Sequence, residues 1–375
     1  MALETLAQPV WVNSAQHLGQ MVDDLLQQPR LAVDTESNSL HAYRERVCLI
    51  QFSTSKIDYL VDPLALDDLS SLDGVFSNPG VEKVFHAAEY DLICLRRDFG
   101  YGFSNIFDTM HAARVLGYSA VGLDKLLGEK FGVQMDKRHQ KADWAARPLT
   151  AEQVHYARLD THYLIPLRDQ LEAELREKGR LELAQEDFER AVSVDETRPK
   201  AVMEAWERYS GRRDLSVREL TILSELLRCR EKIAASLDRP VFKVIEDSKL
   251  IAIARLEAES HEQLAEAGLS DKQIRLWGEP VLAAVRRGSE AAPVERRRTA
   301  RPNDAMVARL DRLKSWRKKV AHEMGVESDI VLPKPYLQVL AEHAPRTSEA
   351  LKKLMADSPR RYEQYGAQIL KVLGA

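Results

Sequence analysis

The 375-residue sequence contains few cysteines, only Cys48, Cys94 and Cys229. Three cysteines without close spacing exclude a disulfide scaffold and a cysteine-rich zinc site, and they suit a reducing compartment. No apolar run approaches the length of a membrane span. The first residues also lack the basic and apolar regions of a signal peptide. We therefore expect a cytoplasmic protein with no membrane partner.

Charge is distributed unevenly along the chain, although the net charge is only −4. Residues 1–200 contain 22 Lys and Arg against 32 Asp and Glu, whereas residues 301–375 contain 14 against 9. A chain of this length predicts two or three domains. The charge pattern favours an acidic, metal-dependent domain followed by a modestly basic binding region.

The first strong motif is the segment Leu-Ala-Val-Asp-Thr-Glu at residues 31–36. Its apolar residues alternate as in a strand, and side chains two apart on a strand share a face. Asp34 and Glu36 would therefore present two carboxylates close together, which favours a bound cation such as Mg²⁺ or Mn²⁺. Two further strands, over residues 47–52 and 57–61, predict a meander with this one.

Two later segments add acids at defined positions. A short strand over residues 83–86 precedes a helix whose first turns contain Asp91, an acid that the helix dipole alone would also favour. Thr150 and Gln153 form a capping box at the start of a long helix, which Pro166 should interrupt. Within that helix, Tyr156 and Asp160 are four residues apart and so share a face. We expect another helix to begin at residues 106–109 and to end near Gly117.

A polar loop over residues 136–144 lies between these helices and contains Lys137, Gln140 and Trp144. A tryptophan in so polar a segment indicates either stacking on a nucleic acid base or packing within its own domain. The sequence leaves both interpretations open.

After residue 195 the strand patterns end, and a helical module occurs twice. Arg-Glu-Lys-Ile-Ala at residues 230–234 matches Arg-Lys-Lys-Val-Ala at residues 317–321, and Trp277-Gly278 matches Tyr365-Gly366. The offsets of 87 and 88 residues predict two copies of one domain. Residues 286–301, which contain three consecutive arginines, are predicted to form an exposed linker.

Taken together, the motifs resemble those of the ribonuclease D family of 3′→5′ exonucleases. The matching stretches are Val-Asp-Thr-Glu at residues 33–36, Lys-Val-Phe-His-Ala-Ala-Glu-Tyr-Asp at residues 83–91 and the segment around Tyr156 and Asp160. The resemblance implies an α/β, ribonuclease H-like (DnaQ-like) exonuclease domain with a mixed sheet. It also implies two all-α domains of the HRDC type. The expected domains are residues 1–200, 210–292 and 303–375.

The resemblance further implies two divalent metal ions, Mg²⁺ or Mn²⁺, bound by four acids. In this family pattern, Asp34 bridges the ions, Glu36 and Asp160 complete the first site, and Asp91 holds the second. Tyr156 would orient the attacking water. A sister subclass uses a histidine five residues before the last aspartate, where this chain has His155, so spacing alone admits both; the surrounding residues resemble the tyrosine subclass.

The implied activity is trimming of RNA 3′ ends, expected in the maturation of tRNA precursors, with release of nucleoside 5′-monophosphates. Lys137 and Gln140 would contact the RNA. One alternative is a DNA 3′→5′ exonuclease, but the chain contains no G-x-x-x-x-G-K-[ST] motif of a linked helicase. The other is a non-catalytic RNA-binding scaffold, against which all four acids and the tyrosine are present. No protein partner follows from the sequence.

Overall fold

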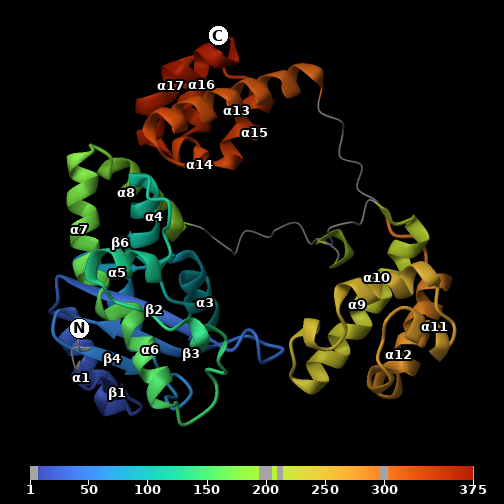
Figure 1. Ribbon diagram of the computed structural model, residues 1–375. Coiled ribbons are helices and arrows are strands. Elements are labelled where there is room, and N and C mark those ends of the chain that lie inside the picture. Colours follow the sequence, from blue (N-terminus) through green and yellow to red (C-terminus); the bar gives the residue numbers. More distant parts are fainter. Residues whose placement is uncertain (1–6, 194–204, 209–213, 296–302, 375) are drawn as a thin grey trace. The chain divides into compact units, whose positions relative to one another are not determined.

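The computed structural model describes residues 7–193, 205–208, 214–295 and 303–374 (Figure 1). By internal contacts the chain divides into two units. One contains residues 1–37, 47–194 and 301–375, and the other contains residues 38–46 and 195–300. None of the helices in the described ranges combines the length and apolar character needed to cross a membrane.

A six-stranded mixed sheet forms the centre of the first domain, in the order β1-β4-β3-β2-β5-β6. The consecutive strands β2, β3 and β4 pair antiparallel, which confirms the predicted meander, and the other pairs are parallel. The strands are β1 (Val10–Val12), β2 (Arg30–Ser37), β3 (Val47–Ser53), β4 (Asp58–Val61), β5 (Glu82–Phe85) and β6 (Ile106–Asp108).

Helices cover both faces of this sheet. The helices of the first domain are α1 (Ala15–Leu26), α2 (Asp73–Phe76), α3 (Glu89–Phe99), α4 (Thr109–Leu116), α5 (Leu123–Phe131), α6 (Ala151–His162), α7 (Leu164–Glu177) and α8 (Leu181–Ser193), with short 3-10 turns η1 (Ser70–Leu72) and η2 (Lys137–Lys141). Leu31 and Val33 of β2 pack with α1, α2 and α3, whereas Ala32 packs on the opposite face with α4, α5, α7 and α8.

The alternation of β2 therefore places Asp34 and Glu36 on the face of Ala32. This is the face that α6 crosses, since α6 contacts β2, β3 and β4.

Of two local predictions in this domain, the helix start at residues 106–109 is wrong in part, and the interruption near Pro166 is confirmed. Residues 106–108 form the short strand β6 and not the start of a helix, because Ile106 and Phe107 are buried and pair in parallel with Lys83 and Val84 of β5. The long helix from Ala151 ends at His162, and α7 follows at once with Pro166 in its first turn. Proline is tolerated there because the first amides of a helix have no intrahelical acceptor.

Two helical domains complete the chain. The first contains α9 (Val217–Leu237), α10 (Asp247–Leu256), α11 (His261–Glu266) and α12 (Asp271–Glu290), with η3 (Ala205–Arg208) and η5 (Val241–Lys243); the second contains α13 (Asp304–Met324), α14 (Ser328–Val331), α15 (Lys334–His343), α16 (Ser348–Leu354) and α17 (Pro359–Leu373). Buried Arg230 donates to the Ile245 carbonyl at 2.9 Å. Its counterpart Arg317 donates to the Leu332 carbonyl at 2.8 Å. This shared contact keeps the offset of 87 residues found in the sequence.

The predicted linker at residues 286–301 is wrong in its first part. Helix α12 continues to Glu290, because Gly288 packs tightly against Ile222 of α9 within the same domain. The Arg296–Arg298 run lies outside the described residues, as does the predicted domain boundary at residue 200.

Within its unit, the second helical domain packs against α8 through a buried arginine. Arg361 of α17 has no exposed surface and binds Glu186 at 2.5 Å and Asp187 at 2.9 Å. It also donates to the Ile330 carbonyl at 2.9 Å, so its guanidinium is satisfied on several sides. Arg361 thus pairs with two buried acids, of which Asp187 also pairs with Arg190, and removing one partner of such a buried pair is costly.

Candidate active site

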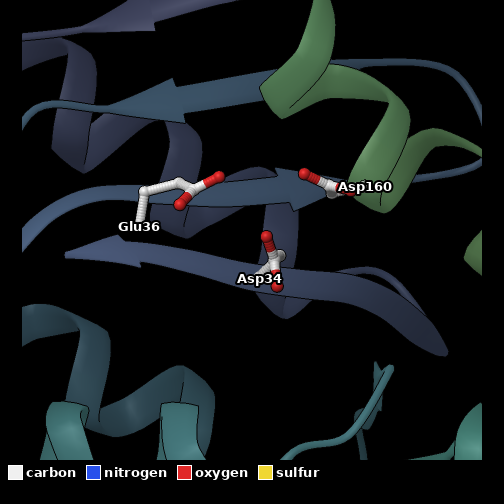
Figure 2. A group of neighbouring side chains, drawn as sticks. All are labelled: Asp34, Glu36 and Asp160. Atoms are coloured by element: carbon white, nitrogen blue, oxygen red, sulfur yellow. The ribbon is translucent and has the colours of Figure 1, made fainter. Parts of the chain in front are cut away.

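Three carboxylates from two elements meet above the sheet. Asp34 and Glu36 project from β2, and Asp160 reaches toward them from α6, as Figure 2 shows. Each offers an oxygen, and these three oxygens all lie within 4.8 Å of one another. Such a set of oxygen ligands matches the preference of Mg²⁺ and Mn²⁺.

The sequence of α6 fixes where Asp160 lies. The predicted capping box is present, since the Thr150 side chain accepts from the Gln153 amide and the Gln153 side chain accepts from the Thr150 amide. Beyond it, Arg158 donates to Asp58 of β4 at 2.7 and 3.0 Å, and His162 contacts the same carboxylate at 3.0 Å. Asp58 therefore holds α6 on both sides of Asp160.

Asp91 comes from a third element, the first turn of α3. The Thr35 hydroxyl, between the two acids of β2, donates to Asp91 Oδ1 at 2.5 Å. The charge of Asp34 also raises the pKa of Asp91, after the larger effect of burial, so the two carboxyl groups interact. The structure thus brings all four predicted acids to one region, with Asp91 beside the trio.

The electrostatics of this region strongly disfavour four bare negative charges. Burial, and then the neighbouring acids, raise the pKa values of Asp34 and Glu36 well above the ordinary range. Burial and the charge of Asp91 raise the pKa of Asp160 to about 8. Burial and mutual repulsion thus favour the protonated forms of these groups, whereas divalent ions would neutralise them as carboxylates. The donor set therefore fits divalent metal ions.

Tyr156 shares the face of Asp160, as its spacing predicts. A side-chain hydrogen bond from Tyr156 lowers the pKa of Asp160 against the larger effect of burial. The tyrosine side chain is almost fully buried, whereas His155 is exposed. Of the two residues that spacing alone admits, the helix directs only Tyr156 toward the acids.

The polar loop contacts the site through its own domain. Gln140 of η2 forms a side-chain hydrogen bond with Tyr156, and the His139 ring lies 6.0 Å from the Tyr156 ring. Lys137 forms an ion pair with Asp124 of α5 at 2.9 Å and remains half-exposed. A role of Lys137 and Gln140 in RNA contact stays a prediction.

Trp144 packs inside the protein, which decides between the two interpretations of its loop. It is 1% exposed, and its ring centroid lies 6.0 Å from that of Tyr156. Arg147, three residues later, donates to Asp62 at 2.7 Å and to the Cys48 carbonyl at 2.7 Å, which ties the loop to the sheet. The buried tryptophan therefore supports the tyrosine and cannot offer its face to a base.

One residue beside the acids, Gln51, was not predicted from the sequence as part of the site. Gln51 of β3 pairs directly with Asp34 in the antiparallel register and donates to its Oδ2 at 3.4 Å. Gln51 is fully buried, although most glutamines are exposed. A glutamine inside the otherwise apolar run Val-Cys-Leu-Ile-Gln-Phe was the available signal.

Comparison with known proteins supports the interpretation of both parts of the chain. Residues 9–176 match the 3′-5′ exonuclease family, and residues 219–285 and 306–373 each match the HRDC domain. The second match confirms the repeat predicted from the sequence.

Similar proteins are known from several organisms. Exosome complex exonuclease RRP6 of Saccharomyces cerevisiae is 41% identical over 174 residues, which make up 46% of this chain and 24% of that protein. The chain thus spans about a quarter of the length of this relative. Ribonuclease D of Acidiphilium cryptum is 32% identical over 260 residues, covering 68% of this chain and 66% of that one.

A solved structure is similar along nearly the whole chain. It is Escherichia coli RNase D, described as an exoribonuclease involved in structured RNA processing. The two structures align with a TM-score of 0.71 and 25% identity over 94% of this chain and 100% of that one. The predicted fold class, a mixed α/β exonuclease domain followed by helical domains, is confirmed. With this domain order, the chain belongs to the ribonuclease D-like 3′-5′ exonucleases.

Proposed function

We propose that this protein is a metal-dependent 3′→5′ exoribonuclease that trims the 3′ ends of tRNA precursors in the cytoplasm. The observation that carries the proposal is the trio of Asp34, Glu36 and Asp160, with Asp91 beside it and Tyr156 hydrogen-bonded to Asp160. The relatives named above are described as an exonuclease and an exoribonuclease, which supports exonucleolytic hydrolysis of RNA as the reaction.

Phosphodiester hydrolysis requires an activated water and stabilisation of the leaving 3′-oxygen. Two divalent ions about 4 Å apart would supply both when bound. In this proposal Asp34 would contribute to both ion sites, Glu36 and Asp160 would hold the first ion, and Asp91 would hold the second. The products are nucleoside 5′-monophosphates.

Tyr156 has a separate role in this proposal. Its hydroxyl, held by Asp160 and Gln140, would orient the attacking water. Burial, and then the nearby acids, raise the pKa of this hydroxyl, so it stays protonated and positions the water as a neutral group. Lys137 is half-exposed and suits a terminal phosphate as a point charge.

The test is hydrolysis of a tRNA with a 3′ extension, compared with a DNA of the same sequence, at saturating Mn²⁺ or Mg²⁺. We expect stepwise loss of 3′ nucleotides from the RNA and loss of activity with EDTA. Asp34→Asn should be inactive while still folded. Faster degradation of the DNA would favour a DNA exonuclease, and metal-independent RNA binding without hydrolysis would favour a scaffold.

A further inference from the structure

Asp108, at the end of β6, is a fully buried acid with an unusual number of hydrogen bonds. Its Oδ1 accepts from the amides of Ala87 at 3.1 Å, Met110 at 2.9 Å and His111 at 3.0 Å. Its Oδ2 accepts from the Ala88 amide at 2.8 Å and contacts His111 Nδ1 at 3.2 Å. Burial opposes ionisation, but the contacts with His111 and further groups lower the pKa of Asp108 to about 2. An ionised carboxylate suits this environment because both of its oxygens only accept hydrogen bonds.

These bonds join two helix starts. Met110 and His111 open α4, for which Asp108 is the N-cap. Ala88 is the N-cap residue of α3, and it has no side chain that can accept a hydrogen bond. Asp108, on the strand next to β5, therefore supplies the turn before α3 with an acceptor carboxylate of the kind that a capping residue usually provides.

The turn before α3 needs such support. Ala87 has a φ of 65°, in the left-handed region that residues other than glycine rarely adopt. The bonds from the Ala87 and Ala88 amides to Asp108 hold the backbone in that conformation. Asp91 follows three residues after Ala88, so the direction of this turn determines where the Asp91 carboxylate lies.

A second contact fixes the same strand end. Phe85 of β5 and Asp108 of β6 are register partners. The Thr109 hydroxyl donates to the Phe85 carbonyl at 2.9 Å and contacts His86 Nδ1 at 2.9 Å. The start of α3 and the start of α4 are thus both attached to the ends of β5 and β6.

We propose that Asp108 is a positioning residue for Asp91, acting through the Ala87–Ala88 turn to set the metal site that Asp91 completes. The inference rests on the proposed function, because it assumes that Asp91 binds a metal ion. Asp108 itself faces the turn and α4, so it is not a metal ligand. Supporting residues of this kind typically change metal affinity by about 10- to 100-fold when substituted.

The experiment is a Mn²⁺ titration, followed by electron paramagnetic resonance, of the full-length chain and three variants. Asp91→Asn identifies the class of Mn²⁺ sites that depends on Asp91. Asp108→Asn replaces one acceptor oxygen with an amide that cannot accept. Asp58→Asn is the matched control, because Asp58 is also a buried acid but holds α6 and Asp160. The Mn²⁺ concentration that half-saturates RNA hydrolysis is measured in parallel.

We expect Asp108→Asn to weaken the same class of Mn²⁺ sites as Asp91→Asn, by about tenfold or more, with turnover recovering at high Mn²⁺. Asp58→Asn should leave that class near normal. If Asp108→Asn lowers the melting temperature but binds Mn²⁺ like the unchanged protein, Asp108 is only structural and the inference is wrong.

Failure of the proposed function would look different. In that case, the unchanged protein would bind no Mn²⁺, or Asp91→Asn would leave binding intact. If Asp108→Asn does not fold, Thr109→Val decides, since valine keeps the shape of threonine and removes its contacts with Phe85 and His86. A weakening of several-fold in the Asp91 class supports the inference, and unchanged Mn²⁺ binding overturns it.

Discussion

Replacing Tyr156 with phenylalanine tests the chemistry of the site with the smallest change in structure. Phenylalanine keeps the ring that packs 6.0 Å from Trp144, centroid to centroid, and removes only the hydroxyl that bonds Asp160 and Gln140. Loss of a side-chain hydrogen bond of this kind costs about 1 kcal/mol of folding free energy. The protein should therefore remain folded, with only a small fall in melting temperature.

The effect on hydrolysis should be far larger than the effect on folding. One positioned group that handles protons contributes a factor of ~10²–10⁴ to a rate. At 1.36 kcal/mol for each tenfold change, this corresponds to about 3–5 kcal/mol of activation free energy. Single-turnover hydrolysis of a 3′-tailed RNA at saturating Mn²⁺ measures it directly, and a Mn²⁺ titration should show near-normal metal binding.

His155 provides the matched control for Tyr156. It is the neighbouring residue on α6, but it is exposed, whereas Tyr156 is 7% exposed. His155→Ala should retain most of the turnover. An inactive His155→Ala variant beside an active Tyr156→Phe variant would refute the assignment and would place the chain in the histidine subclass.

Burial and neighbouring charge raise the pKa of Asp160 from 3.8 to about 8, so the stability that comes from its protonation is present at low pH and is lost as pH rises through about 8. The metal-free protein should therefore melt at lower temperature at pH 8 than at pH 5, and the rise on adding Mn²⁺ should be larger at pH 8; equal rises in calorimetry would contradict this. Arg361→Met removes the cation between two buried acids and should cost about 3–5 kcal/mol in urea unfolding, whereas exposed Arg360→Met should cost little. Similar losses in both variants would contradict the role of the buried contact. Lys318→Glu, on the exposed surface of the basic last domain, should weaken tRNA binding and flatten its dependence on salt by about one unit or more of slope. An unchanged slope would place the RNA elsewhere.

Features that depend on residues close in sequence could be predicted from the sequence. The alternation of residues 31–36 set the shared face of Asp34 and Glu36, and helical spacing paired Tyr156 with Asp160. The 87-residue offset identified the two helical copies. In the first two cases the sequence pattern and the local geometry have the same period, whereas the repeat was found by matching residues at a constant offset.

Features that depend on contacts between distant segments were missed or left open. The strand at residues 106–108 is only three residues long, and it exists because β5 lies beside it. Trp144 is in a polar loop, and its burial depends on Arg147 reaching Asp62, which is 85 residues away. The bonds of Asp108 to Ala87 and Ala88 likewise require the folded sheet.

The buried Arg361 also distinguishes the two helical copies from each other. At an offset of 88 residues, the first copy has Gln273, which closes a capping box with Ser270 and donates to the Val244 carbonyl of its own domain. At this helical position, Gln273 of the first copy binds within its own domain, whereas Arg361 of the second copy binds α8. The two copies are therefore not interchangeable. A chimera with the first copy in both places would put the neutral amide of Gln273 where Arg361 lies, so Glu186 would lose its buried cation and Asp187 would keep only Arg190.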